Sequence, residues 1–180
     1  MNRREALSSV ALLLGGTIIG SSAFLSGCKA NPDAAAGVLS AADMSLLNDI
    51  AEIIIPTTNT PGAKAAKVGE FMGVIVTDCY DVKDQKVFKD GLAALASKFS
   101  AANAEAQRKM IVDLDGEAKK YQETKTSEQP SHYFTMIKQL TLWGYFSSEI
   151  GATQALRYVA IPGKYEGCVP YKKGDKAWAS

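Results

Sequence analysis

Residues 84–99, which read DQKVFKDGLAALASKF, carry large apolar side chains at a helical spacing. The four largest recur at i, i+4, i+7 and i+11, in one stripe along an α-helix: Phe88, Leu92, Leu95 and Phe99. Lysine, aspartate and serine occupy other positions and suit a solvated face. The stretch therefore predicts an amphipathic helix that needs a core to pack against.

The chain before this stretch predicts two more helices. Ser40 followed by Asp43 forms a variant capping box, and apolar residues then recur at helical spacing until Pro56. A turn-rich loop over 56–62 separates that helix from a second one over 68–80. The residues of the second helix that we expect to face inward are Phe71, Val74 and Ile75, with Cys79 as a further candidate.

The chain after it predicts two further helices and a tail. Asn103 suits the N-cap of a fourth helix, but the polar residues 115–130 fit a helical extension or a loop equally well. Ser131 is the expected cap of a fifth helix that runs to about residue 148. A short helical piece is expected over 153–158, and the proline and glycine residues beyond it favour an irregular arm.

These elements predict the fold class and the extent of the domain. Apolar and polar residues never alternate over a run long enough for a sheet, and no long repeat is visible. We therefore predict an all-α fold, a small bundle of about five helices with an irregular C-terminal arm, over residues 40–180.

The first 39 residues predict an export signal and a tether. A charged start precedes an apolar run over 10–19, which has the length of a signal-peptide core. Small residues then precede a cysteine, in a sequence that resembles a bacterial lipobox: Leu25, Ser26, Gly27 and Cys28. Residues 1–27 are the predicted signal peptide, Cys28 the lipidation site and 28–39 the lipidated tether. A plain secretory signal and an uncleaved anchor helix are the alternatives.

The adjacent Arg3 and Arg4 resemble a twin-arginine export signal, which is read by a translocon for folded cargo. Ala6 stands where that motif usually has phenylalanine, so general secretory export is the alternative. Either route predicts an exported protein on the periplasmic side, anchored to a membrane that the sequence does not identify.

The composition excludes several kinds of function. With one histidine and three cysteines, the chain lacks the ligands for a histidine-rich zinc site, a zinc finger or a cysteine-bound iron–sulfur cluster. A formal net charge of +1 indicates no nucleic-acid partner. Neither nucleotide-binding glycine motif is present, nor is a G-x-S-x-G elbow. His132, the single imidazole, is expected to cap a helix or lie at the surface. We therefore expect no catalytic, cofactor-binding or metal-binding residue in this chain.

Two cysteines remain once Cys28 is assigned to lipid. In an oxidising compartment Cys79 and Cys168 can form a disulfide, which would join the arm to the second predicted helix. Two free thiols are the alternative. We predict the disulfide.

Aromatic residues are concentrated in the fifth predicted helix and cover more than one of its sides. One side can fill the core, and the rest must be buried against the arm or a partner. Core packing alone is the alternative explanation. The candidate interface residues, counting one tyrosine in the arm, are Tyr133, Phe134, Trp143, Tyr145, Phe146 and Tyr165.

Five segments of the chain resemble the gluconate 2-dehydrogenase subunit 3 family. They are Ala51–Pro56 (AEIIIP), Thr60–Ala63 (TPGA), Asp78–Tyr80 (DCY), Leu140–Gly151 (LTLWGYFSSEIG) and Pro162–Pro170 (PGKYEGCVP). The resemblance spans about residues 40–170. Its most specific parts are GYFSSEIG at 144–151 and YEGC at 165–168.

This resemblance implies a small subunit without a cofactor, in a membrane-associated complex. The large subunit of such complexes is an FAD-dependent dehydrogenase of the GMC type that oxidises a sugar, sugar acid or other alcohol, and a cytochrome c subunit often receives the electrons. The small subunit supports maturation, export or stability of the large one. A transient export chaperone and a stand-alone structural lipoprotein are the alternatives. A lipobox departs from the family pattern and implies that this chain is itself a membrane anchor.

Overall fold

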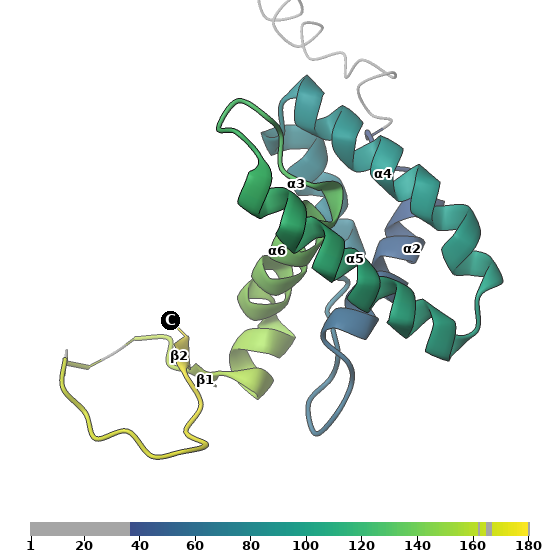
Figure 1. Cartoon of the computed structure of the whole chain (residues 1–180). Helices are drawn as coiled ribbons and strands as arrows, with labels where there is room; N and C mark the ends of the chain where they lie inside the picture. Colours follow the sequence, from purple (N-terminus) through teal and green to yellow (C-terminus); the bar gives the residue numbers. More distant parts are fainter. Residues whose placement is uncertain (1–36, 162, 165–166, 180) are drawn as a thin grey trace, which may run out of the picture. The chain divides into compact units, whose positions relative to one another are not determined.

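The computed structural model describes residues 37–161, 163–164 and 167–179. Within these residues five α-helices are followed by a π-helical turn, and the bounds are α2 (Ala41–Ile54), α3 (Val68–Cys79), α4 (Val82–Ala101), α5 (Ala104–Thr124), α6 (Tyr133–Ser147) and η1 (Gly151–Ala155). Two short strands, β1 (Arg157–Tyr158) and β2 (Trp178–Ala179), pair in parallel near the C-terminus (Figure 1). The predicted all-α class and the irregular C-terminal region are confirmed.

Side-chain caps set where most of these helices begin. The Ser40 hydroxyl accepts the Asp43 N–H, and the Asp43 carboxylate accepts the Ser40 N–H, which completes the predicted capping box. Asn103 caps α5 as predicted, by accepting the Ala106 N–H at 2.9 Å. The cap of α6 is His132 and not Ser131, because the His132 Nδ1 accepts the Phe134 N–H at 3.2 Å.

The start of α3 is capped from another helix. Lys67, which precedes it, has a left-handed backbone (φ 53°) and makes no side-chain cap. Asn48 of α2 replaces that cap, since its Oδ1 accepts the Gly69 N–H at 2.8 Å. Its Nδ2 donates to Glu70 at 2.9 Å. A Cβ on Gly69 would lie 2.2 Å from the Met44 carbonyl oxygen, so α2 and α3 pack at close range.

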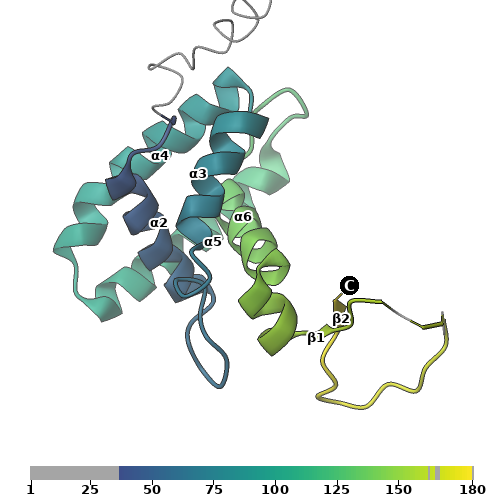
Figure 2. The ribbon, with the colours of Figure 1, turned by 180° about the vertical axis from the view of Figure 1, so that it is seen from behind.

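The core is built around α6, which packs against α2, α3, α4 and α5. Figure 2 shows α6 beside α3 in the view from behind. The stripe of apolar residues that predicted α4 is buried in this core, with no member more than 4% exposed: Phe88, Leu92, Leu95 and Phe99. Burial of such side chains is the main favourable term in folding.

Two segments differ from the sequence-based expectation. The polar stretch after Asp115 continues as helix to Thr124 and only then becomes a loop. The helical piece expected over 153–158 is present only in its first part, as the π-helical η1, and the chain then continues into β1. The segment is extended because it pairs with a strand near the C-terminus: the Arg157 N–H donates to the Ala177 carbonyl at 2.8 Å.

Candidate partner-binding surface

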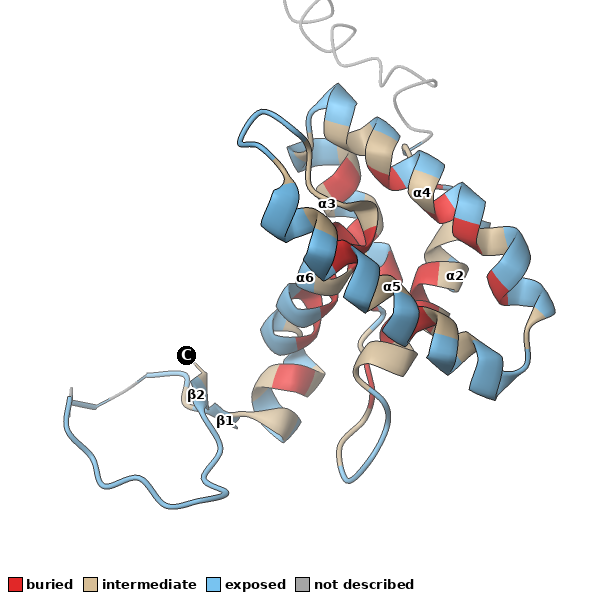
Figure 3. Ribbon diagram, viewed as in Figure 1, coloured by how far each residue is buried: buried red, intermediate tan, exposed pale blue. Residues whose placement is uncertain are grey.

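The aromatic residues of α6 divide between the core and the surface. Phe134 and Tyr145 are each 1% exposed, whereas Trp143 is 56% and Phe146 41% exposed. Figure 3 shows exposed and buried residues alternating along α6. The predicted division of this helix into a core side and an outward side is therefore present.

The exposed side of α6 continues onto α3. The rings of Phe71 and Trp143 meet edge to face, with centroids 5.3 Å apart. Gly144 makes this approach possible, because a Cβ there would lie 2.6 Å from the Phe71 Cδ1. Together these residues form what we call the apolar face: Phe71, Val74, Leu142, Trp143 and Phe146.

The exposed part of the apolar face carries no charge on α6. From Gln139 to Ser147 the helix has no ionisable side chain except the buried Tyr145. Leu142 is 42% and Val74 58% exposed, so the face presents aliphatic as well as aromatic groups to solvent. Adjacent exposed apolar side chains on a folded domain mark a protein or membrane contact.

Three members of the apolar face were not identified from the sequence as interface residues: Phe71, Val74 and Leu142. Val74 was predicted to face inward, which is wrong: the buried residues of α3 are Val68, Gly69, Met72 and Val76. Val74 lies two positions from Met72 and from Val76, about 200° around the helix from each. Val68, Met72 and Val76 are apolar and four positions apart, and this spacing in the sequence could have predicted a buried side of the helix that excludes Val74.

The predicted interface residues differ in how far the structure buries them. Phe134 and Tyr145 belong to the core, so the prediction that they contact a partner is wrong in this structure. Tyr133 is half-buried, because its ring covers Gly91 of α4 and lies 4.6 Å from the His132 ring. Trp143 and Phe146 remain available at the surface. Tyr165 lies outside the described residues.

The loop over 56–62 is joined by hydrogen bonds to both α6 and α2. The Tyr145 hydroxyl donates to the Pro61 carbonyl at 2.7 Å. The Glu52 carboxylate accepts the Thr57 N–H, the Thr57 hydroxyl and the Lys64 N–H. Burial raises the pKa of Glu52, but these hydrogen bonds outweigh it and hold the pKa below its ordinary value. The loop therefore links α6 to α2 through hydrogen bonds.

The two described cysteines are both free and exposed. Cys79 ends α3, and Cys168 lies in the arm, where every described residue from 167 to 178 is exposed. The disulfide predicted between them is not formed in this structure. With no buried contact around Cys168, nothing in the described arm holds its thiol at the distance a disulfide needs.

No group of histidine, cysteine and carboxylate side chains among the described residues could hold a metal ion. His132 uses its Nδ1 as a helix cap, and its ring lies between those of Tyr121 and Tyr133. Burial lowers the pKa of His132, more than the nearby Glu117 carboxylate raises it. None of the described helices has the length and apolar character needed to span a bilayer.

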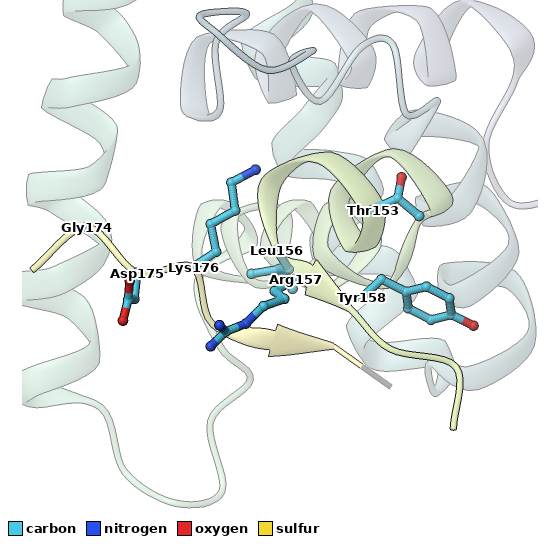
Figure 4. Close-up of a pocket in the computed structure, with 7 residues that line it drawn as sticks. All are labelled: Thr153, Leu156, Arg157, Tyr158, Gly174, Asp175 and Lys176. Carbon is cyan, nitrogen blue, oxygen red and sulfur yellow. The ribbon is translucent and has the colours of Figure 1, made fainter. Parts of the chain in front are cut away.

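Two hollows lie away from the apolar face. One, of about 610 Å³, is open and lies between η1 and the arm (Figure 4). Its two cations are engaged, since Arg157 stacks on Trp178 and Lys176 donates to the Gln154 carbonyl. The other, of about 210 Å³, is lined mostly by apolar groups and by the ion pair of Lys138 with Asp115. The open hollow is also lined by Thr153, Tyr158 and Asp175, whereas the other has no hydroxyl or thiol group among its lining residues.

The residues predicted for export and lipid attachment lie outside the described part of the chain. They are Arg3, Arg4, Leu25, Ser26, Gly27 and Cys28. Their roles stay predictions.

Comparison with known proteins gives one match. No curated protein and no solved structure matches the chain. The family model described as gluconate 2-dehydrogenase subunit 3 matches residues 41–163, which covers every α-helix from α2 to α6 and reaches into the arm. The chain therefore belongs to the gluconate 2-dehydrogenase subunit 3 family.

Proposed function

We propose that this chain is a non-catalytic accessory subunit that binds a large FAD-dependent dehydrogenase of the GMC type through the apolar face. The large subunit would oxidise a sugar, sugar acid or other alcohol and pass electrons to a cytochrome c subunit. The observation that carries the proposal is Trp143, which is 56% exposed yet held edge to face by Phe71. A large, pre-positioned aromatic side chain at the surface is typical of an interface anchor.

The chemistry of the apolar face supports a lasting interface. Its α6 residues are uncharged, so burying them removes no ion from water, and the aromatic area supplies the favourable term. The Phe71 contact and the close approach at Gly144 restrict the Trp143 side chain before binding. Less conformational entropy is then lost on association.

The test is a tagged pull-down from gently solubilised native membranes, with the partner's identity and a flavin absorbance spectrum as readouts. A stoichiometric flavoprotein supports the subunit function. A colourless monomer contradicts it, and recovery of the flavoprotein only with the precursor form indicates a transient export chaperone instead.

Substitution then tests whether the apolar face makes the contact. Trp143→Ala should weaken partner binding by about 2 kcal/mol or more, which is roughly thirtyfold. The control is Val112→Ala on α5, because Val112 is an apolar residue 64% exposed outside the apolar face. Unfolding of both variants is measured in parallel. If Trp143→Ala lowers monomer stability but leaves affinity unchanged, the residue serves the fold and the proposed interface is wrong.

We further propose that the chain attaches the complex to a membrane through lipid on Cys28, after export directed by the Arg3-Arg4 signal. The lipobox-like order of Leu25, Ser26, Gly27 and Cys28 supports this. Cys28→Ala should abolish labelling by a radioactive fatty acid and release the protein from membranes. Arg3→Lys with Arg4→Lys should block export by the twin-arginine route. Unchanged fatty-acid labelling of the Cys28 variant would contradict lipidation.

A further inference from the structure

The domain has no formal net charge, but its helical part and its C-terminal arm carry opposite charges. Residues 37–155 contain twelve basic and fifteen acidic side chains, a formal charge of −3. Residues 156–180, the arm, have a formal charge of +3, from five basic against two acidic side chains: Arg157, Lys164, Lys172, Lys173 and Lys176, with Glu166 and Asp175.

The ends of the arm are joined to each other next to η1. The Arg157 N–H donates to the Ala177 carbonyl at 2.8 Å, and the Val159 N–H donates to the Ala179 carbonyl at 2.9 Å. The Arg157 guanidinium lies 3.7 Å from the centre of the Trp178 ring. Lys176 also reaches back to the Gln154 carbonyl of η1, and Figure 4 shows its side chain extended toward that turn. These contacts close the arm into a loop.

The described part of this loop carries apolar side chains on the outside. Five of them are between 49% and 86% exposed: Tyr158, Ile161, Val169, Tyr171 and Trp178. Tyr171 is followed directly by Lys172 and Lys173, so aromatic and basic groups are adjacent in this part of the arm. Two-residue strands are marginal by themselves in water, and these apolar groups find no cover among the described residues of the arm.

We propose that the arm docks onto an anionic phospholipid surface. Tryptophan and tyrosine favour the interface between headgroups and acyl chains, and lysine is attracted to acidic headgroups. The negative charge of residues 37–155 disfavours contact of the helices with the same surface. The arm is thus the part of the domain that faces the lipid.

The length of the N-terminal tether is compatible with this contact, and here the inference rests on the proposed lipidation of Cys28. Eight residues, 29–36, separate Cys28 from the first described residue, Gly37. A fully extended chain of that length spans at most about 30 Å. A lipid on Cys28 therefore keeps the domain close to the bilayer, where each basic side chain strengthens contact with an anionic surface by about fivefold.

The chain contains two tryptophans, and this allows the arm and the apolar face to be observed separately. Trp143→Phe leaves Trp178 as the only tryptophan, and Trp178→Phe leaves Trp143. The full-length processed protein carrying either substitution is reconstituted into vesicles of phosphatidylcholine, with or without phosphatidylglycerol. Quenching of tryptophan fluorescence by brominated acyl chains reports contact with the bilayer.

We expect Trp178 to be quenched, with a blue-shifted emission, only in vesicles that contain phosphatidylglycerol, and high salt should reverse the effect. Trp143 should show no such dependence. Replacing Lys172 and Lys173 by glutamate should abolish the quenching of Trp178. The matched control replaces Lys119 and Lys120, two consecutive exposed lysines on α5, by glutamate and should leave the quenching unchanged.

Two results would overturn the proposal. One is Trp178 quenching that does not differ between neutral and anionic vesicles, or that survives the Lys172 and Lys173 reversal. The other is shielding of Trp178 only when the flavoprotein is added, which would make the arm a contact for that protein. Lipidation is judged separately by flotation with neutral vesicles. If Cys28 carries no lipid, the arm still predicts salt-sensitive flotation with anionic vesicles alone.

Discussion

The Tyr145 hydroxyl donates a 2.7 Å hydrogen bond to the Pro61 carbonyl, 84 residues earlier in the chain. Tyr145 is 1% exposed. Trp143 and Phe146, which lie close to it in the sequence of α6, are exposed and belong to the apolar face. One residue therefore fixes the loop over 56–62 to the helix that presents Trp143 and Phe146. The proposed binding surface depends on a contact made entirely inside the domain.

Replacing Tyr145 by phenylalanine should lower the free energy of unfolding by about 1 kcal/mol, because the Pro61 carbonyl loses its partner while the ring packing is kept. Tyr145→Ala should lower it by about 3–5 kcal/mol, since it also leaves a cavity. Urea denaturation measures both. Equal stability of the phenylalanine variant and the unmodified protein would show that this hydrogen bond contributes nothing.

Asn48 should be sensitive to substitution because it caps α3 from α2. Asn48→Ala leaves the buried Gly69 N–H unpaired and should cost about 1–3 kcal/mol, measured by urea denaturation. Asn48→Asp keeps an acceptor for Gly69 but places a carboxylate beside Glu70, so it should destabilise more at neutral pH than in acid. A stability of Asn48→Asp that does not change with pH would contradict this account.

Gly151 is required for close backbone packing at the junction of α6 and η1. A Cβ there would lie 1.9 Å from the Tyr145 carbonyl oxygen, a main-chain atom that cannot move freely. Gly151→Ala should therefore destabilise the domain by about 1–3 kcal/mol in thermal or urea unfolding. Gly116→Ala is the control: apart from the local backbone of α5, no atom lies within 4 Å of its Cβ position, so alanine should stabilise by about 1 kcal/mol. Equal effects at both sites would refute the packing argument.

The cap of α6 should make stability depend on pH. Burial lowers the pKa of His132, and only the neutral ring can accept the Phe134 N–H at Nδ1. The contribution of this cap to stability is then complete above the unfolded-state pKa of about 6.5 and is lost as the pH falls through the lower folded-state pKa. The free energy of unfolding should therefore decrease as the pH is lowered through this range. Because His132 is the single histidine, His132→Asn, which keeps a capping oxygen, should remove the slope.

The candidate surface was only partly predictable from the sequence. The aromatic segment indicated a helix with more than one apolar side, and Trp143 and Phe146 are indeed exposed. Spacing alone could not show that Phe134 and Tyr145 are the core residues, because that depends on which side of α6 meets α4 and the loop over 56–62. Phe71 joined the surface only when α3 packed across Gly144.

Local patterns in the sequence determined the helical class, the apolar stripe of α4 and the caps at Ser40 and Asn103, since each depends on residues within one or two turns. Tertiary structure decided what joins distant residues: Asn48 at the start of α3, Tyr145 against Pro61, and the pairing of β1 with β2. The physical reason is that local spacing sets which side chains share a face. Which neighbour covers that face depends on the packing of the whole chain.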